Sequence, residues 1–225
     1  MTRRFACTLA MTAGLFGAES NKRPASICTT ERVDFAPGGT IRIDGSFGYL
    51  TIEGWDEPVV QVTVTRSTDQ LYESRQKDES QRRLGLIKVV AERRSETELA
   101  ITTSRGHKPH VSVDYRILAP RDSQLVIHHD TGYVWVDEMM GGIEAHSHTG
   151  DMTLLLPMAA RYSIDARTRM GDVASDFEGI DKSEFLVGTR FRNAMEEPSR
   201  RLFLRMGRGK ITIRQAGPRV STEVN

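Results

Sequence analysis

The chain has 225 residues, with 31 basic and 30 acidic side chains and a formal net charge of +1. Because these charges nearly cancel, the chain has no overall electrostatic field that would attract nucleic acid or an anionic membrane, although the balance does not exclude a local basic patch. The two cysteines, Cys7 and Cys28, are too few for a disulfide framework or a cysteine-built zinc module.

The first 18 residues have the pattern of an export signal. A basic start (residues 1–4) precedes a mostly apolar stretch (5–18) that is too short for a comfortable membrane span. We therefore predict a signal peptide over 1–18, a flexible leader with a free Cys28 thiol over 19–32, and a periplasmic, cell-surface or secreted protein. The alternative is an amphipathic N-terminus that is not a signal.

From residue 35 onward, apolar and polar residues alternate with a period of two, which is typical of half-buried strands. Turn-forming Gly, Pro and Asp residues separate these segments. The pattern predicts an all-β domain over 33–214 and a tail over 215–225. The predicted strands include residues 40–44, 49–53, 60–64, 86–91, 99–102, 111–117, 133–137 and 210–214.

Only residues 69–83 have a helical composition, and their sole apolar members are the neighbours Leu71 and Tyr72. Because a helix without an apolar stripe has little to hold it against a core, we predict an exposed insertion over about 67–84 with at most one loose helix.

A repeat is visible in the second half of the chain. Gly132, Gly150 and Gly171 each precede a strand, at intervals of 18 and 21 residues, and Gly188 and Gly209 continue the spacing loosely. Gly48 heads a similar earlier segment. A period near twenty predicts a β-solenoid-like or β-roll architecture with glycine corners, and the alternative is a meander of hairpins.

With these features, the chain resembles the putative-adhesin β-repeat family of bacteria (DUF4097). The resemblance covers about residues 33–214 and rests on the order of several short motifs, which are Phe35-Ala-Pro-Gly-Gly39, the segment from Gly48 to Asp56, Val113-Asp-Tyr-Arg-Ile117-Leu-Ala-Pro120 and the Gly132, Gly150 and Gly171 coils. It implies an exported, mostly β-solenoid-like envelope protein, and it supplies no catalytic residues.

Four of the six histidines fall within 21 residues. If the apolar positions before each glycine face the core, the outward positions hold His128, Asp130, His146 and His148, which stacking would bring together. Imidazole and carboxylate ligands suit zinc, so these four residues form a candidate metal site. The alternative is a solvated polar face, which flanking Arg167 and Arg169 favour.

The remaining histidines carry no predicted chemistry. His129 follows the inward positions and is interpreted as a core histidine. His107 and His110 lie in a separate loop and are interpreted as surface residues.

Two aromatic residues on one strand, Tyr133 and Trp135, are predicted to face outward as a contact strip for a ligand or partner. The chain has no nucleophile elbow, zinc-protease, phosphate-loop or calcium-loop motif. We therefore expect a non-enzymatic, envelope-associated protein that binds or scaffolds an envelope protein or a glycan. The first alternative is a metal-binding protein using zinc at the histidines, and the second is an enzyme of unrecognised type.

Overall fold

The computed structural model describes residues 4–5, 25–68, 77–104, 111–157, 161–184, 188–193 and 200–216. Within these ranges, one helix, α1 (Lys77–Gly85), accompanies fifteen strands of a single mixed sheet, so the predicted all-β class is confirmed. The strands are β1 (Arg4–Phe5), β2 (Ser26–Asp34), β3 (Thr40–Trp55), β4 (Val59–Thr68), β5 (Val89–Arg93), β6 (Glu98–Thr103), β7 (Val111–Pro120), β8 (Gln124–Asp137), β9 (Ile143–Pro157), β10 (Tyr162–Met170), β11 (Val173–Ser175), β12 (Ile180–Glu184), β13 (Gly188–Arg192), β14 (Arg200–Arg208) and β15 (Ile211–Ala216).

The three longest strands, β3, β8 and β9, each carry two alternating apolar segments. In β3, Ile41 and Ile43 are buried before the middle of the strand, and Leu50 and Ile52 are buried after it. Each half therefore buries one face, and both faces belong to one continuous core. We call a strand of this kind, with both of its halves, a coil. The two halves of a coil lie in two layers around that core.

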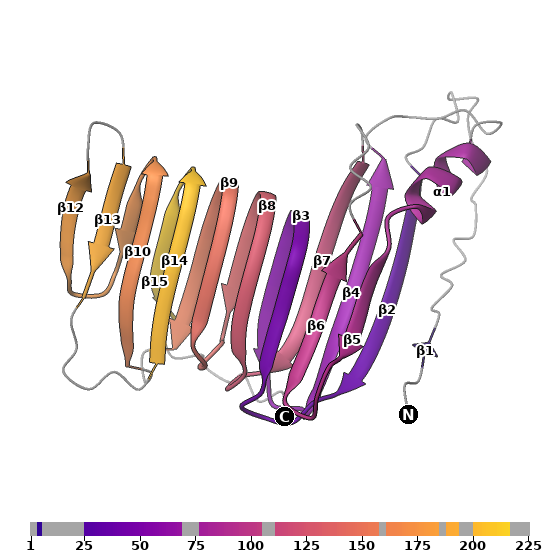
Figure 1. Cartoon of the computed structure of the whole chain (residues 1–225), viewed down its shortest axis with the longest axis horizontal. Coiled ribbons are helices and arrows are strands. Elements are labelled where there is room, and N and C mark those ends of the chain that lie inside the picture. The colour runs from indigo at the N-terminus through magenta and orange to yellow at the C-terminus, as the bar shows by residue number, and fades with distance from the viewer. Residues whose placement is uncertain are drawn as a thin grey trace, which may run out of the picture.

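Parallel pairing stacks the coils side by side, as the row of strands in Figure 1 shows. β8 pairs with β3 on one side and with β9 on the other. Three further coils are split into two shorter strands each: β6 with β7 beside β3, β14 with β15 beside β9, and β10 with β11 beside β14 and β15.

The coils do not stack in chain order. The repeat predicted that the Gly171 coil would follow the Gly150 coil, but β14 and β15 lie between β9 and the pair β10 and β11. All coils present the same inward pattern of apolar residues, so alternation alone does not define which coils are neighbours. The sheet is mixed and open, and the predicted solenoid or roll is not confirmed.

Antiparallel strands cover both ends of the parallel stack. At one end β4 pairs with β7, β2 with β4, and β5 with β6, whereas at the other end β13 pairs with β10 and β12 with β13. In Figure 1 these strands flank the central coils, with α1 beside β2. The parallel coils are therefore enclosed between two antiparallel ends.

Glycines mark the bend of the central coils, as predicted. Gly48 pairs with Gly132, and Gly132 with Gly150, on neighbouring strands. Gly150 has a φ of +130°, and a Cβ atom there would collide with the carbonyl oxygen of Gly132. Gly209 approaches Gly150 in the same way, and Gly171 approaches Gly209. The bend thus requires residues without side chains, because neighbouring backbones touch there.

The boundary predicted for the leader is wrong. Residues 26–32 belong to β2, and every residue of this strand pairs with β4. A strand at the end of a sheet is held by backbone hydrogen bonds to its one neighbouring strand. Its sequence therefore need not show the alternation of apolar and polar residues on which the prediction depended. Cys28 is an exposed free cysteine on this strand. Apart from Arg4–Phe5, the predicted signal peptide lies outside the described residues.

The insertion predicted as exposed is anchored at its C-terminal end. α1 places Leu84 in a fully buried position, and Ile87, two residues after the end of the helix, is also fully buried. Residues 69–76 of the insertion lie outside the described ranges, as do residues 217–225 of the predicted tail. No helix in the described parts of the chain has the length and apolar character needed to span a membrane.

Candidate functional site

The predicted aromatic residues form an exposed strip. Tyr133 is 49% exposed and Trp135 is 43% exposed, on the outer face of the second half of β8. Tyr49 of β3 joins them: it is 54% exposed and stacks on Tyr133, with ring centroids 5.0 Å apart and ring planes within 14°. We call Tyr49, Tyr133 and Trp135 the aromatic strip.

Sequence reasoning missed Tyr49, although the repeat contained the signal for it. Tyr49 follows Gly48 as Tyr133 follows Gly132, and these two glycines are paired in the sheet. Equivalent residues of neighbouring coils lie side by side, so the second tyrosine follows from the pairing of the two glycine corners.

Polar side chains border the aromatic strip. Thr51 and Thr153 lie on either side of Trp135 in the register of β3, β8 and β9. Two residues along β3, Glu53 accepts a bidentate hydrogen bond from Arg116, with an Arg116 Nη2–Glu53 Oε2 distance of 3.0 Å. The strip therefore combines aromatic rings with hydroxyl and charged groups on a flat face.

The predicted histidine site has a different arrangement from the one expected. Nδ1 of His128 lies 2.7 Å from Oδ1 of Asp44 on β3, a partner that the sequence did not indicate. The rings of His128 and His146 lie 5.4 Å apart, and Nε2 of His146 lies 3.2 Å from Oε1 of Glu144. Stacking does bring His128 beside His146, as predicted.

His148 and Asp130 are both exposed, and each lies two residues along its strand from the pair His128 and His146. In the part of the chain that the structure describes, no three His, Cys, Asp or Glu side chains are grouped to hold a metal ion. The zinc site therefore stays a prediction without support from this geometry.

The arginine that lies beside the histidines is also not the one that was predicted. Arg205, and not Arg167, is the register neighbour of His146, because β14 lies between β9 and β10. A positive guanidinium still lies next to the histidines, and it still disfavours a cation there.

His129 is buried, as predicted, with 3% of its surface exposed. Nδ1 lies 2.9 Å from Oγ of the fully buried Ser46, whereas Nε2 has no hydrogen-bonding partner among the described residues. Burial lowers the pKa of His129 to about 4, because removal from water disfavours the charged imidazolium. His107 and His110 lie outside the described residues.

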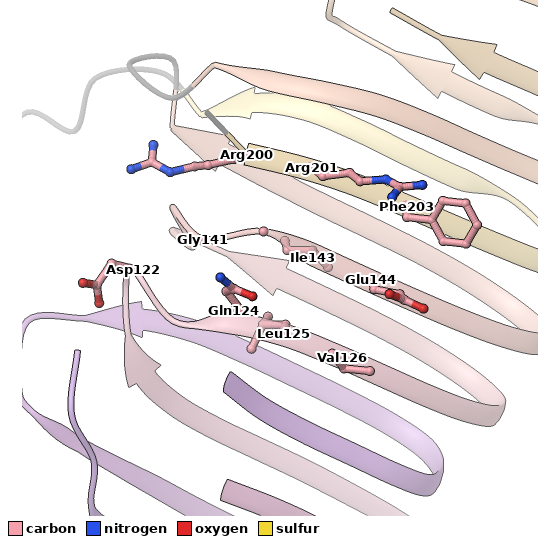
Figure 2. A pocket seen from close by; sticks show the side chains of 11 residues that line it. Asp122, Gln124, Leu125, Val126, Gly141, Ile143, Glu144, Arg200, Arg201 and Phe203 are labelled. Carbon is pink, nitrogen blue, oxygen red and sulfur yellow. The ribbon is translucent and has the colours of Figure 1, made fainter. Parts of the chain in front are cut away.

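A surface groove of about 400 Å³ lies between the starts of β8, β9 and β14. Figure 2 shows Arg200, Arg201 and Phe203 on the β14 side, with Glu144 and Gln124 across from them. Two carboxyl groups, those of Asp122 and Glu144, line this groove together with the guanidinium groups of Arg200 and Arg201.

No protein-family profile matches the chain, and no curated protein matches it in sequence. Among solved structures, a "putative cell adhesion protein" from Clostridium sporogenes has 14% identity and a TM-score of 0.46, and the alignment covers 84% of this chain and 100% of that one. A "putative adhesin" from Parabacteroides merdae has 6% identity and a TM-score of 0.26, with 84% and 96% coverage. Such low scores are no basis for transferring a function.

Proposed function

We propose that the protein is an exported, envelope-associated and non-enzymatic binding module of adhesin type. In this proposal, its stacked and solenoid-like coils present the aromatic strip to a carbohydrate. The observation that carries the proposal is the side-by-side exposure of Tyr49, Tyr133 and Trp135 on paired strands.

Exposed aromatic rings of this kind are typical of recognition surfaces. A soluble protein gains stability by burying large aromatic side chains, so a cluster left in water points to a contact made with another molecule. Tyr and Trp provide a large contact area with few rotatable bonds, so little conformational entropy is lost when a ligand binds.

A carbohydrate suits this strip better than an apolar partner does. The C–H faces of a sugar ring can lie against the negative face of an aromatic ring, while its hydroxyl groups need hydrogen-bonding partners at the edge. Thr51 and Thr153 supply hydroxyl groups beside Trp135, and Glu53 supplies carboxylate oxygens. An apolar partner would leave these polar groups without water or a replacement partner.

A fluorescence titration tests this proposal. The chain has two tryptophans, so a Trp55→Phe variant makes Trp135 the sole indole reporter. We expect cello-, chito- or manno-oligosaccharides to change its emission in a saturable manner.

Binding of the same sugars is then compared calorimetrically in Trp135→Ala and in Leu86→Ala, which removes another exposed apolar side chain, outside the strip. Loss of binding in Trp135→Ala alone supports the proposal. Undiminished binding in Trp135→Ala, or no binding of any of the three sugar classes to the unmodified protein, would refute it.

A further inference from the structure

The groove between the starts of β8, β9 and β14 has the size of a site for a small ligand. Its volume of about 400 Å³ lies within the range that is typical of ligand pockets. A glycine explains why the surface is hollow there. Gly142 accepts a backbone hydrogen bond from Leu125 at 2.9 Å and faces the backbone of Arg201 on its other side. Because Gly142 has no side chain, it leaves a gap between the side chains of Gln124 and Arg201, which both line the groove.

The two walls of this groove, which we call the charged groove, carry opposite charges. Arg200 and Arg201 lie on the β14 side, whereas Asp122 and Glu144 lie across from them (Figure 2). Among the residues that the structure describes, no ion pair joins an arginine of this groove to either of the two carboxyl groups. The charged groove therefore presents both signs of charge to a ligand.

An aromatic side chain keeps the charges of the two walls apart. The Arg201 guanidinium lies 5.0 Å from the ring centroid of Phe203, and the His146 ring lies 5.8 Å from the same ring. His146 in turn faces Glu144, with an Nε2–Oε1 distance of 3.2 Å. Because these contacts hold Arg201 and Glu144 separately, a ligand meets groups that are already in place and loses less entropy on binding.

The spacing of the strands defines the length of ligand that fits. β9 lies between β8 and β14, so the wall before β8 and the arginine wall are about two strand spacings, or roughly 10 Å, apart. An extended peptide covers about 3.4 Å per residue, so the two termini of a tripeptide are separated by a similar distance. A single amino acid carries its two charges too close together to reach both walls.

We propose that the charged groove binds a short peptide of about three residues with free termini. Arg200 and Arg201 bind its carboxylate through charge-assisted hydrogen bonds, and Asp122 binds its ammonium group. The side-chain amide of Gln124 can both donate to and accept from the peptide backbone between these ends.

Ligands with one sign of charge, or with none, suit the charged groove less well. A phosphate or a sugar acid would bind the arginines but would approach two carboxyl groups of like charge. A neutral sugar would leave the charges of both walls without a charged partner. The inference does not depend on the proposed function, because the aromatic strip lies on the second halves of the coils and the charged groove lies at the starts of β8, β9 and β14.

The test is a nuclear magnetic resonance titration of the isotope-labelled, full-length protein with trialanine. Trialanine should shift the amide signals of Gly141 and Gly142 in a saturable manner. N-acetyl-trialanine lacks the ammonium group and trialanine amide lacks the carboxylate. Each should bind about tenfold more weakly than trialanine, because each loses a hydrogen-bonded charge.

Two variants within the groove and one control locate the site. Arg201→Gln should bind trialanine about tenfold more weakly and trialanine amide unchanged, because the amide has no carboxylate to lose. Gly142→Gln should abolish binding by filling the gap, and it guards against misfolding of Arg201→Gln. A Cβ atom at Gly142 would lie 3.4 Å from its nearest neighbour, and the backbone there is not left-handed. The control, Arg208→Gln, removes the same charge at the other end of β14 and should bind as the unmodified protein does.

Four outcomes would overturn the proposal. The first is the absence of saturable shifts with trialanine, and the second is equal affinity for trialanine and the two blocked peptides. The third is equal weakening in Arg208→Gln, because only net charge would then matter. The fourth is tighter binding of inorganic phosphate or glucuronate than of trialanine, which would make the groove a simple anion site. Trp135→Ala should leave trialanine binding unchanged, so failure of the aromatic strip and failure of the charged groove are distinguishable.

Discussion

Replacing His129 by glutamine should remove a pH dependence of stability that the buried imidazole imposes on the fold. His129 is 3% exposed and has a folded-state pKa of about 4, against 6.5 for an ordinary histidine. Between these two values the unfolded chain binds a proton that the folded chain excludes. The free energy of unfolding therefore has its full value above pH 6.5 and decreases as the pH is lowered. This decrease is complete below pH 4.

The magnitude follows from the two pKa values. A difference of one pKa unit corresponds to about 1.4 kcal/mol, so this imidazole costs about 3 kcal/mol once the pH is below 4. At pH 5 the loss relative to pH 7.5 is about 2 kcal/mol.

Urea denaturation at pH 7.5 and pH 5 measures this loss. Carboxyl groups also titrate in this range, so the informative quantity is the difference between the unmodified protein and His129→Gln. The unmodified protein should lose about 2 kcal/mol more than the variant. The Leu86→Ala variant, as a control, should keep the full pH dependence, because it removes an exposed side chain that does not titrate. If His129→Gln lost as much stability as the unmodified protein, burial would not be what keeps this histidine neutral.

Three other substitutions or titrations test the fold and the metal hypothesis. Gly150→Ala should cost at least about 2 kcal/mol in urea denaturation, because the alanine is strained at positive φ and collides with the neighbouring strand. Gly142→Ala, whose Cβ would lie 3.4 Å from its nearest neighbour, should cost clearly less, and equal costs would contradict this account of the corner. Leu84→Ala should cost about 2 kcal/mol or more and speed proteolysis within α1; an unchanged cleavage rate would mean that this side chain does not anchor the helix. Calorimetric titration with Zn²⁺ at pH 7.5 should give no saturable heat, whereas one-to-one binding that disappears in a His146→Ala, His148→Ala variant would establish the predicted zinc site.

The direction of each side chain was predictable from the sequence, because alternation along a strand is a local property. Leu125 and Ile127 are buried and His128 is exposed, as the positions relative to Gly132 predict. The same counting placed His129 in the core, even though histidine is not a typical core residue. Tyr133 and Trp135 were also correctly placed outside.

The lateral neighbours of these side chains were not predictable in the same way. Asp44 lies beside His128 because β3 pairs with β8, and the two residues are 84 positions apart. Every coil has a similar apolar pattern, so many lateral orders would bury the same residues equally well. Hydrogen bonds and ion pairs between coils depend on that order and need the three-dimensional structure.

The charged side chains around Asp165 illustrate how much depends on the lateral order of the coils. If the coils stacked in chain order, Arg167 would lie beside His146. With β14 between β9 and β10, Arg205 contributes a guanidinium to Asp165 from one side while β13 contributes Arg190 and Arg192 from the other. Two strands distant in sequence thus concentrate positive charge around one carboxylate. A chain with the same residues but with the positions of β10 and β14 exchanged would preserve the buried core pattern and yet separate Asp165 from Arg190 and Arg192 on β13. The surface charge therefore follows from strand order and not from composition.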